Sequence, residues 1–169
     1  MVDRLPQWLA VAALAAGATV LPRYVQSAWR PDAYVVVMAL VAVRARERRA
    51  LGVAWLIGLL RDLASGGAPG VWALLYVVAA FALLWARRTM NLRPAPACAA
   101  ASFLAAMTTA GFHAAAMSLR GRFPASAATL NALLVSAAAT GLCAGLCSWA
   151  YDRYRRLVAR RAYRRAAAT

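Results

Sequence analysis

Few side chains in this 169-residue sequence are suited to acid–base or nucleophilic chemistry. His113 is the only histidine, and Asp62 is a carboxylate set in an otherwise apolar run. The two residues fall in different segments, and no closely spaced pair of carboxylates occurs. The phosphate-binding loop and the HExxH and GxSxG motifs are absent. The sequence therefore predicts a non-enzymatic protein with no catalytic residue and no cofactor.

The three cysteines do not have the pattern of a metal site. Cys143 and Cys147 are spaced i, i+4 and share one helix face, but no second ligand pair accompanies them, as zinc requires. An odd number of cysteines in apolar surroundings also argues against a disulfide framework. We expect Cys98, Cys143 and Cys147 to be small packing residues, with no bound metal.

Charge and hydropathy indicate the class of protein. The chain is 64% hydrophobic yet has a formal net charge of +15, and all 20 basic residues are arginine. A strongly basic balance often indicates nucleic-acid binding. Here, however, the arginines cluster between long uncharged stretches and at the C-terminus, which is typical of membrane proteins. We therefore expect a membrane protein with no nucleic-acid partner.

Six apolar stretches predict an all-α, polytopic fold of about six transmembrane helices. They cover residues 7–21, 33–43, 50–60, 71–86, 95–117 and 125–149. A full span needs about 20 apolar residues, which the last two stretches provide and the fourth approaches. The second and third stretches are short, so a four- or five-helix protein is the alternative. The first stretch has features of a signal peptide, but the spans after it favour a retained helix.

The arginine distribution also predicts the orientation of the chain. If both termini are cytoplasmic, 15 of the 20 arginines fall in cytoplasmic segments. We therefore divide the chain into a transmembrane domain, residues 1–149, and a basic cytoplasmic tail, residues 150–169. The tail either only fixes the orientation, binds anionic lipid headgroups, or docks to a cytoplasmic protein. Its candidate contact residues are Arg153, Arg155, Arg156, Arg160 and Arg161.

A first charged motif precedes the second apolar stretch. Pro31 cannot continue a preceding helix, and Asp32 stands where its carboxylate can accept from the free backbone N–H groups of the next helix. The simplest interpretation is therefore a helix cap. The alternative is that Arg30 and Asp32 belong to an outer surface that meets a partner.

A second charged motif separates the third and fourth apolar stretches. Arg61 and Asp62 follow Gly58 and precede a Gly/Pro-rich break that ends at Gly70. One interpretation is a polar hairpin loop in which Arg61 pairs with its neighbour Asp62. The other is that Asp62 turns back against helix ends and fixes an interaction surface. Gly58, one turn before Asp62, would let a neighbouring helix approach closely.

The fifth stretch carries polar residues near one helix face. Ser102, Thr109 and His113 are spaced by seven and four residues. We expect His113 to form an interhelical hydrogen bond with polar residues of the last stretch, such as Asn131, Ser136 and Thr140. A ligand contact or a proton relay is the alternative. Together with Asn131, the three residues form a candidate intramembrane polar cluster.

The two charged motifs resemble the family of the rod-shape-determining protein MreD. The similarity rests on the PD pair, the apolar helix and basic loop that follow it, and the run GLLRDLASGGAPGVWALLY, over roughly residues 30–90. The family pattern falls on Pro31, Asp32, Gly58, Asp62 and Gly70. Members are small six-helix inner-membrane proteins of about this length. The long basic tail is not a feature of the family core.

The resemblance implies a non-enzymatic scaffold in the bacterial inner membrane. It would belong to the elongasome, the machinery of peptidoglycan synthesis that sets cell shape. The implied partners are a single-span MreC-like protein, MreB, RodA and a penicillin-binding transpeptidase. The family is also similar in fold to the substrate-binding subunits of energy-coupling-factor transporters. This gives an alternative function, vitamin binding for a separate ATPase, and a small membrane enzyme is a third.

Overall fold

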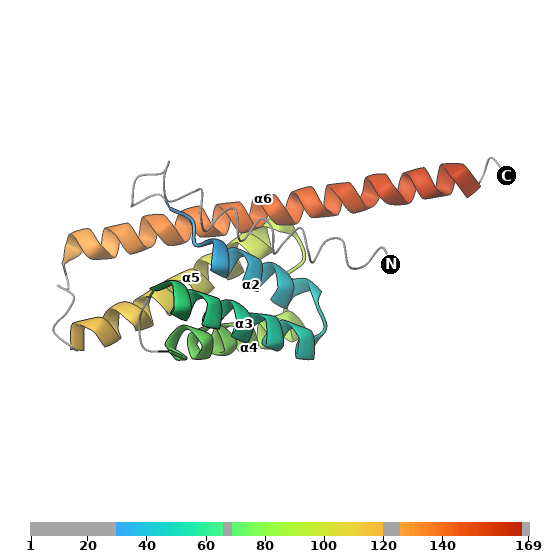
Figure 1. The fold of residues 1–169 in the computed structure, drawn as a ribbon. Coiled ribbons are helices and arrows are strands. Elements are labelled where there is room, and N and C mark those ends of the chain that lie inside the picture. The colour runs from blue at the N-terminus through green and yellow to red at the C-terminus, as the bar shows by residue number, and fades with distance from the viewer. Residues whose placement is uncertain (1–29, 66–68, 120–125, 167–169) are drawn as a thin grey trace.

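The computed structural model describes residues 30–65, 69–119 and 126–166, with side chains as far as Ala159. This part of the chain is all-helical, as the sequence predicts. The helices are α2 (Ala33–Arg44), α3 (Glu47–Ser65), α4 (Val71–Thr89), α5 (Ala95–Leu119) and α6 (Ala127–Ala166) (Figure 1).

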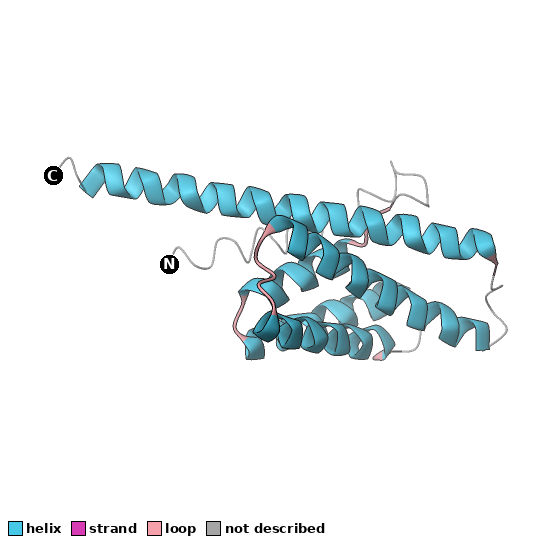
Figure 2. Ribbon diagram, turned by 180° about the vertical axis from the view of Figure 1, so that it is seen from behind, coloured by secondary structure: helices cyan, strands magenta, loops and turns pink. Residues whose placement is uncertain are grey.

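Helix α2 lies at the centre of the described bundle. The helical hairpins α3–α4 and α5–α6 lie on its two sides, and α2 packs against all four of these helices (Figures 1 and 2). Its residues Val35, Met38, Ala39 and Val43 are at most 1% exposed. With 12 residues, α2 is only about 18 Å long, so it is a short apolar helix enclosed by longer ones.

Many large apolar side chains face outward, whereas alanine makes up much of the buried core. On α4, an outer stripe at helical spacing is formed by Leu74, Val78, Phe81 and Trp85, each more than half exposed. The buried positions are rich in alanine, which lets helices pack closely in a membrane. Because soluble proteins rarely expose such contiguous apolar patches, this surface is suited to lipid.

Three of the described helices are long and apolar enough to cross a membrane. They are α4, α5 and the part of α6 up to Ala159. Helix α2 is shorter, and α3 carries charged residues near both ends. The structure thus contains three candidates for the six expected spans, and the expected first span, residues 7–21, lies outside the described residues. Helix α6 runs without a break through the expected boundary at residue 149 and extends beyond the bundle (Figure 1).

The arginine-rich segments meet at one end of the bundle. Arg44, at the end of α2, donates to Ser148 Oγ at 2.8 Å and to Asp152 Oδ1 at 3.2 Å, both on α6. Arg87, near the end of α4, donates to the carbonyl oxygens of Ala42 and Ala45 at 3.0 and 2.7 Å. The connections α2–α3 and α4–α5 therefore lie beside the basic part of α6, so three arginine-rich segments share one end of the bundle.

Helices α3 and α4 come into backbone contact at Gly58, where the sequence suggested a close approach. A Cβ atom added there would lie 2.6 Å from the amide nitrogen of Ala73 and 2.8 Å from the carbonyl carbon of Trp72. Real Cβ contacts are essentially never this short, and the neighbouring atoms are backbone, which cannot move aside easily. A glycine is therefore required for this helix crossing.

Substitution of Gly58 by alanine should destabilise the protein. Alanine gains up to about 1 kcal/mol of helix propensity over glycine, but forcing a methyl group into packed backbone costs about 1–3 kcal/mol. Gly52, also on α3, has nothing within 4 Å of an added Cβ, so Gly52→Ala is the matched control. We expect Gly58→Ala to lower the midpoint of thermal unfolding in detergent and Gly52→Ala to leave it unchanged or raise it. Equal midpoints for the two variants would contradict the close crossing.

Candidate functional site

Asp32 caps the N-terminus of α2, as the sequence suggests. Its Oδ1 accepts hydrogen bonds from the amide nitrogens of Tyr34 at 3.1 Å and Val35 at 3.2 Å. A carboxylate at this position satisfies N–H groups that have no partner within the helix. The start of α2 is therefore fixed by the side chain that immediately precedes it.

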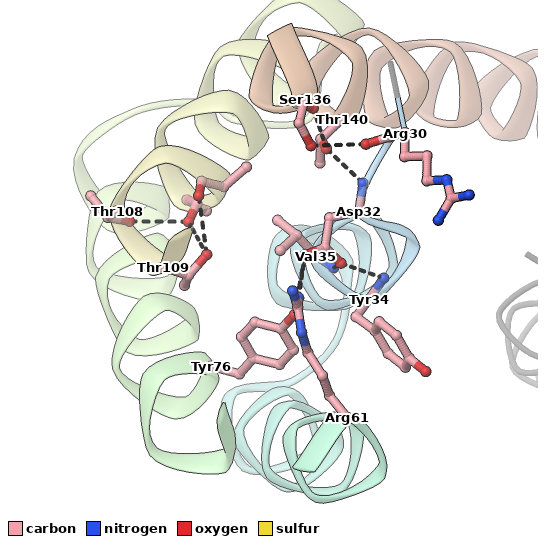
Figure 3. Close-up of polar contacts among 12 residues, drawn as sticks. Arg30, Asp32, Tyr34, Val35, Arg61, Tyr76, Thr108, Thr109, Ser136 and Thr140 are labelled. Carbon is pink, nitrogen blue, oxygen red and sulfur yellow. Dashed lines mark hydrogen bonds and ion pairs between the residues drawn. The ribbon is translucent and has the colours of Figure 1, made fainter. Parts of the chain in front are cut away.

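The same segment is attached to the middle of α6. The amide of Asp32 donates to Thr140 Oγ1 at 2.8 Å, and the hydroxyl of Ser136 donates to the carbonyl oxygen of Arg30 at 2.8 Å (Figure 3). The side chain of Arg30 points away from the Asp32 carboxylate in this view. These bonds hold the backbone of residues 30–32 against α6. The carboxylate of Asp32 remains within reach of α3 and α4.

Arg61 pairs with Asp32 and not with its neighbour Asp62, so the expected local pair is wrong. Its Nη1 donates to Asp32 Oδ2 and to the hydroxyl of Tyr76 on α4, and the Tyr76 hydroxyl also lies 3.5 Å from that carboxylate oxygen (Figure 3). The side chains of Arg61 and Asp32 are 23% and 20% exposed. This partly buried ion pair joins α3 to the start of α2, with α4 bound through Tyr76.

Aromatic residues enclose the Arg61 guanidinium. Its central carbon lies 3.6 Å from the ring centroid of Trp72, within the range of a cation–π interaction. Trp72 is also stacked on His113 of α5, with 4.3 Å between ring centroids. Trp72 therefore connects the charged pair to the α5–α6 hairpin.

The hydrogen bond expected from His113 to α6 is not found. Its Nδ1 is buried and has no hydrogen-bond partner within the described part of the chain. The α6 hydroxyls proposed as partners are engaged elsewhere, because Ser136 and Thr140 hold the segment before α2. The ring of His113 instead packs on Trp72.

Asp62 caps α4 across the helix hairpin. Its carboxylate is buried and accepts from the amide nitrogens of Gly70 at 2.9 Å, Trp72 at 3.0 Å and Ala73 at 3.2 Å. Gly70 itself has φ +94°, a left-handed conformation that glycine adopts without strain, and provides no side-chain cap. Asp62 therefore turns back against the start of α4, as the second interpretation of this motif predicts.

The candidate polar cluster of the fifth stretch does not assemble. The hydroxyl of Ser102 donates to the carbonyl oxygen of Cys98 at 2.7 Å, and that of Thr109 donates to Ala105 at 2.8 Å, both within α5. Asn131 is exposed on α6. Among the residues that the structure describes, no hydrogen bond joins Ser102, Thr109, His113 and Asn131, because backbone carbonyls one turn earlier satisfy the hydroxyls.

The basic tail continues α6. Arg153 lies over the ring of Trp149, 5.4 Å from its centroid, while Arg155 and Arg156 are exposed. The side chains of Arg160 and Arg161 lie outside the described residues. The exposed part of this helix is available to lipid or protein.

Two residues of the site, Trp72 and Tyr76, were not anticipated from the sequence. They are one turn apart at the start of α4 and are both buried. Their only sequence signal is aromatic spacing directly after the Gly/Pro-rich break. That spacing predicts a shared helix face but not the arginine that binds it.

Replacing Asp62 should weaken the fold more than replacing the half-exposed carboxylate of Asp152. Asp62→Ala leaves three backbone N–H groups at the start of α4 without their acceptor, so we expect a loss of about 2–4 kcal/mol in the free energy of unfolding. Asp62→Asn keeps one acceptor oxygen and should have an intermediate effect. The control is Asp152→Asn, whose side chain is 39% exposed and, among the described residues, accepts a hydrogen bond from Arg44 alone. Unfolding in detergent, followed by helical circular dichroism, measures all three, and equal losses for Asp62→Ala and Asp152→Asn would contradict the cap.

The site therefore consists of two capped helix starts, an ion pair with its aromatic neighbours, and a glycine contact. It brings together Asp32, Gly58, Arg61, Asp62 and Gly70 of the two charged motifs at one end of the bundle. Comparison of the chain with protein-family models, with curated proteins and with solved structures found no match.

Proposed function

We propose that the chain is a non-enzymatic scaffold of the bacterial cell-wall elongation machinery, similar in role to MreD. The supporting observation is that the motif residues hold helices together. Asp32 and Asp62 cap α2 and α4, Gly58 admits α4 to α3, and Gly70 forms the turn. Residues that hold helices in fixed positions support a scaffold role, because a scaffold presents a defined surface to its partners.

The hydrogen bonds of the Asp32 and Asp62 carboxylates support a non-enzymatic role. A general base must reach a proton of its substrate. The Asp62 carboxylate is instead buried and bonded to three backbone amides, and that of Asp32 is bonded to Arg61 and to the start of α2. Both carboxylates therefore form structural interactions that hold helices together.

The outward-facing apolar stripes support partners within the membrane. We propose a multi-pass protein of the inner membrane with six spans and both termini cytoplasmic. The short helix α2, the helix α3 with charged residues near both ends, and the first apolar stretch, residues 7–21, would supply the three further spans. The single transmembrane helix of an MreC-like protein would pack against an exposed apolar stripe, and MreB, RodA and a penicillin-binding transpeptidase would join through that protein. The fold would be similar to that of energy-coupling-factor substrate-binding subunits.

The alternative of vitamin binding requires polar groups that converge on a ligand. The hydroxyls of Ser102 and Thr109 are bonded within α5, and Asn131 faces outward. The geometry of these residues therefore favours the scaffold over the transporter subunit.

The proposal is tested by depletion and affinity purification in the source bacterium. We expect cells depleted of the chain to become round, and a tagged chain extracted in detergent to recover an MreC-like single-span protein. Rod-shaped cells after depletion, with no such protein recovered, would contradict the scaffold. Recovery of ATPase subunits together with a bound vitamin would support the transporter subunit instead.

Two variants of α3 test whether partner binding depends on the Arg61–Asp32 pair. Arg61→Gln removes the charge that pairs with Asp32, whereas Arg49→Gln removes an equal charge from an exposed position of α3. At equal protein levels, we expect Arg61→Gln to recover much less MreC-like partner than the original chain, and Arg49→Gln to recover as much. Equal recovery by the two variants would separate the charged pair from partner binding.

A further inference from the structure

An open hollow lies at the arginine-rich end of the bundle, opposite the capped helix starts. It has a volume of about 630 Å³ and is formed by the α2–α3 connection, the end of α4 and the turn that leads to α5. Five of its lining residues are arginines: Arg44, Arg46, Arg87, Arg88 and Arg93. No residue assigned to the proposed function lies in it.

The positive charge of this hollow is only partly neutralised. Arg88 pairs with Glu47 at 2.9 Å, and Arg44 pairs with Asp152 at 3.2 Å. Within the described ranges, no carboxylate pairs with Arg46, Arg87 or Arg93. Counted over the described residues, the hollow therefore has an excess of three positive charges, which attracts an anion with more than one negative oxygen.

The arginines of the hollow differ in their hydrogen-bond partners and in their exposure. Arg87 is bonded to the carbonyl oxygens at the end of α2, so it is fixed in place. Arg46 and Arg93 are exposed and line the hollow from two different connections, α2–α3 and α4–α5. Nη1 of Arg44 is buried and has no hydrogen-bond partner among the described residues. An acceptor in the hollow would meet donors from both sides.

The position of the hollow indicates the source of the anion. It lies where α4 ends at Thr89 and α5 begins at Ala95, and both helices are long and apolar enough to span a membrane. Lipid phosphates lie at this depth, at the edge of the hydrocarbon core. Met90, which lines the hollow just after the end of α4, is 67% exposed, and Trp85, five residues earlier on α4, is 64% exposed. Apolar and aromatic side chains beside a basic pocket fit a ligand with acyl chains below its phosphate.

We propose that this hollow binds the headgroup of an anionic phospholipid, cardiolipin or phosphatidylglycerol. The phosphate oxygens would contact Arg46 and Arg93, with the acyl chains along the outer face of α4. A bound headgroup would connect the α2–α3 and α4–α5 turns and thereby stabilise this end of the bundle. None of the lining residues belongs to the basic tail, although Arg44 pairs with Asp152 at the start of that tail. The site does not depend on the proposed function.

The test uses the purified full-length chain in a neutral detergent, titrated with tetraoleoyl cardiolipin or with dioleoyl phosphatidylcholine. Bound lipid is counted by native mass spectrometry, and the midpoint of thermal unfolding is measured in parallel. We expect cardiolipin to bind and to raise the midpoint, and phosphatidylcholine to do neither. The Arg46→Gln/Arg93→Gln double variant should bind cardiolipin about tenfold or more weakly, because each arginine near a lipid phosphate contributes substantially to binding.

Two matched controls remove the same charge elsewhere. Arg48→Gln/Arg49→Gln lies on the exposed start of α3 outside the hollow, and Arg155→Gln/Arg156→Gln lies on the α6 tail. Both should keep the cardiolipin affinity of the original chain. An equal loss in all three double variants would show general charge attraction and overturn the site, as would unchanged binding by the hollow variant.

Inorganic phosphate distinguishes a lipid site from a site for free anions. We expect millimolar phosphate to leave the unfolding midpoint unchanged. A rise equal to that given by cardiolipin would overturn the lipid assignment. If the double variant does not fold, by its circular dichroism and its elution volume, the single variants Arg46→Gln and Arg93→Gln replace it. Both change exposed side chains.

Discussion

The ion pair between Arg61 and Asp32 is the interaction on which the arrangement of the bundle depends. It joins α3 to the start of α2, and through Tyr76 it also holds α4. In a membrane protein, a helix that begins inside the bundle has N–H groups without water to bind them. A carboxylate satisfies these groups but introduces a charge that must itself be neutralised. Asp32 does the first, and Arg61 does the second.

The rest of the structure follows from having two such helix starts at one end. Asp62 caps α4 across the hairpin, which requires the backbones to approach at Gly58 and the chain to turn at Gly70. At the other end, arginines close the helix ends, as when Arg87 binds the last carbonyls of α2. One end is thus fixed by carboxylates and the other by arginines. The arginine end is the one that the charge distribution predicts to be cytoplasmic. Among the described residues it carries arginines without a carboxylate partner, and we propose that lipid phosphates neutralise them.

Local sequence predicts the elements well but not the contacts between them. Apolar stretches 33–43 and 95–117 became α2 and α5 almost unchanged, and the Asp32 cap follows from its place before a helix. Hydropathy marks only the apolar part of α6, to residue 149, because the last turns of this helix are basic, although arginine is a good helix former. The partner of Arg61 was missed because Asp62 is adjacent in sequence, whereas Asp32 is 29 residues away. Only helix packing brings the two together, and the packing of His113 on Trp72 is a case of the same kind.

The most direct test of the account is a double-mutant cycle on the Arg61–Asp32 pair. Asp32→Asn keeps a capping oxygen for α2, and Arg61→Gln keeps a polar side chain, so the cycle isolates the charge interaction. The free energy of unfolding is measured for the original chain, both single variants and the double variant in lipid bicelles. The account predicts a coupling energy of about 1–3 kcal/mol between the two positions. Additive effects, within about 0.3 kcal/mol, would contradict it.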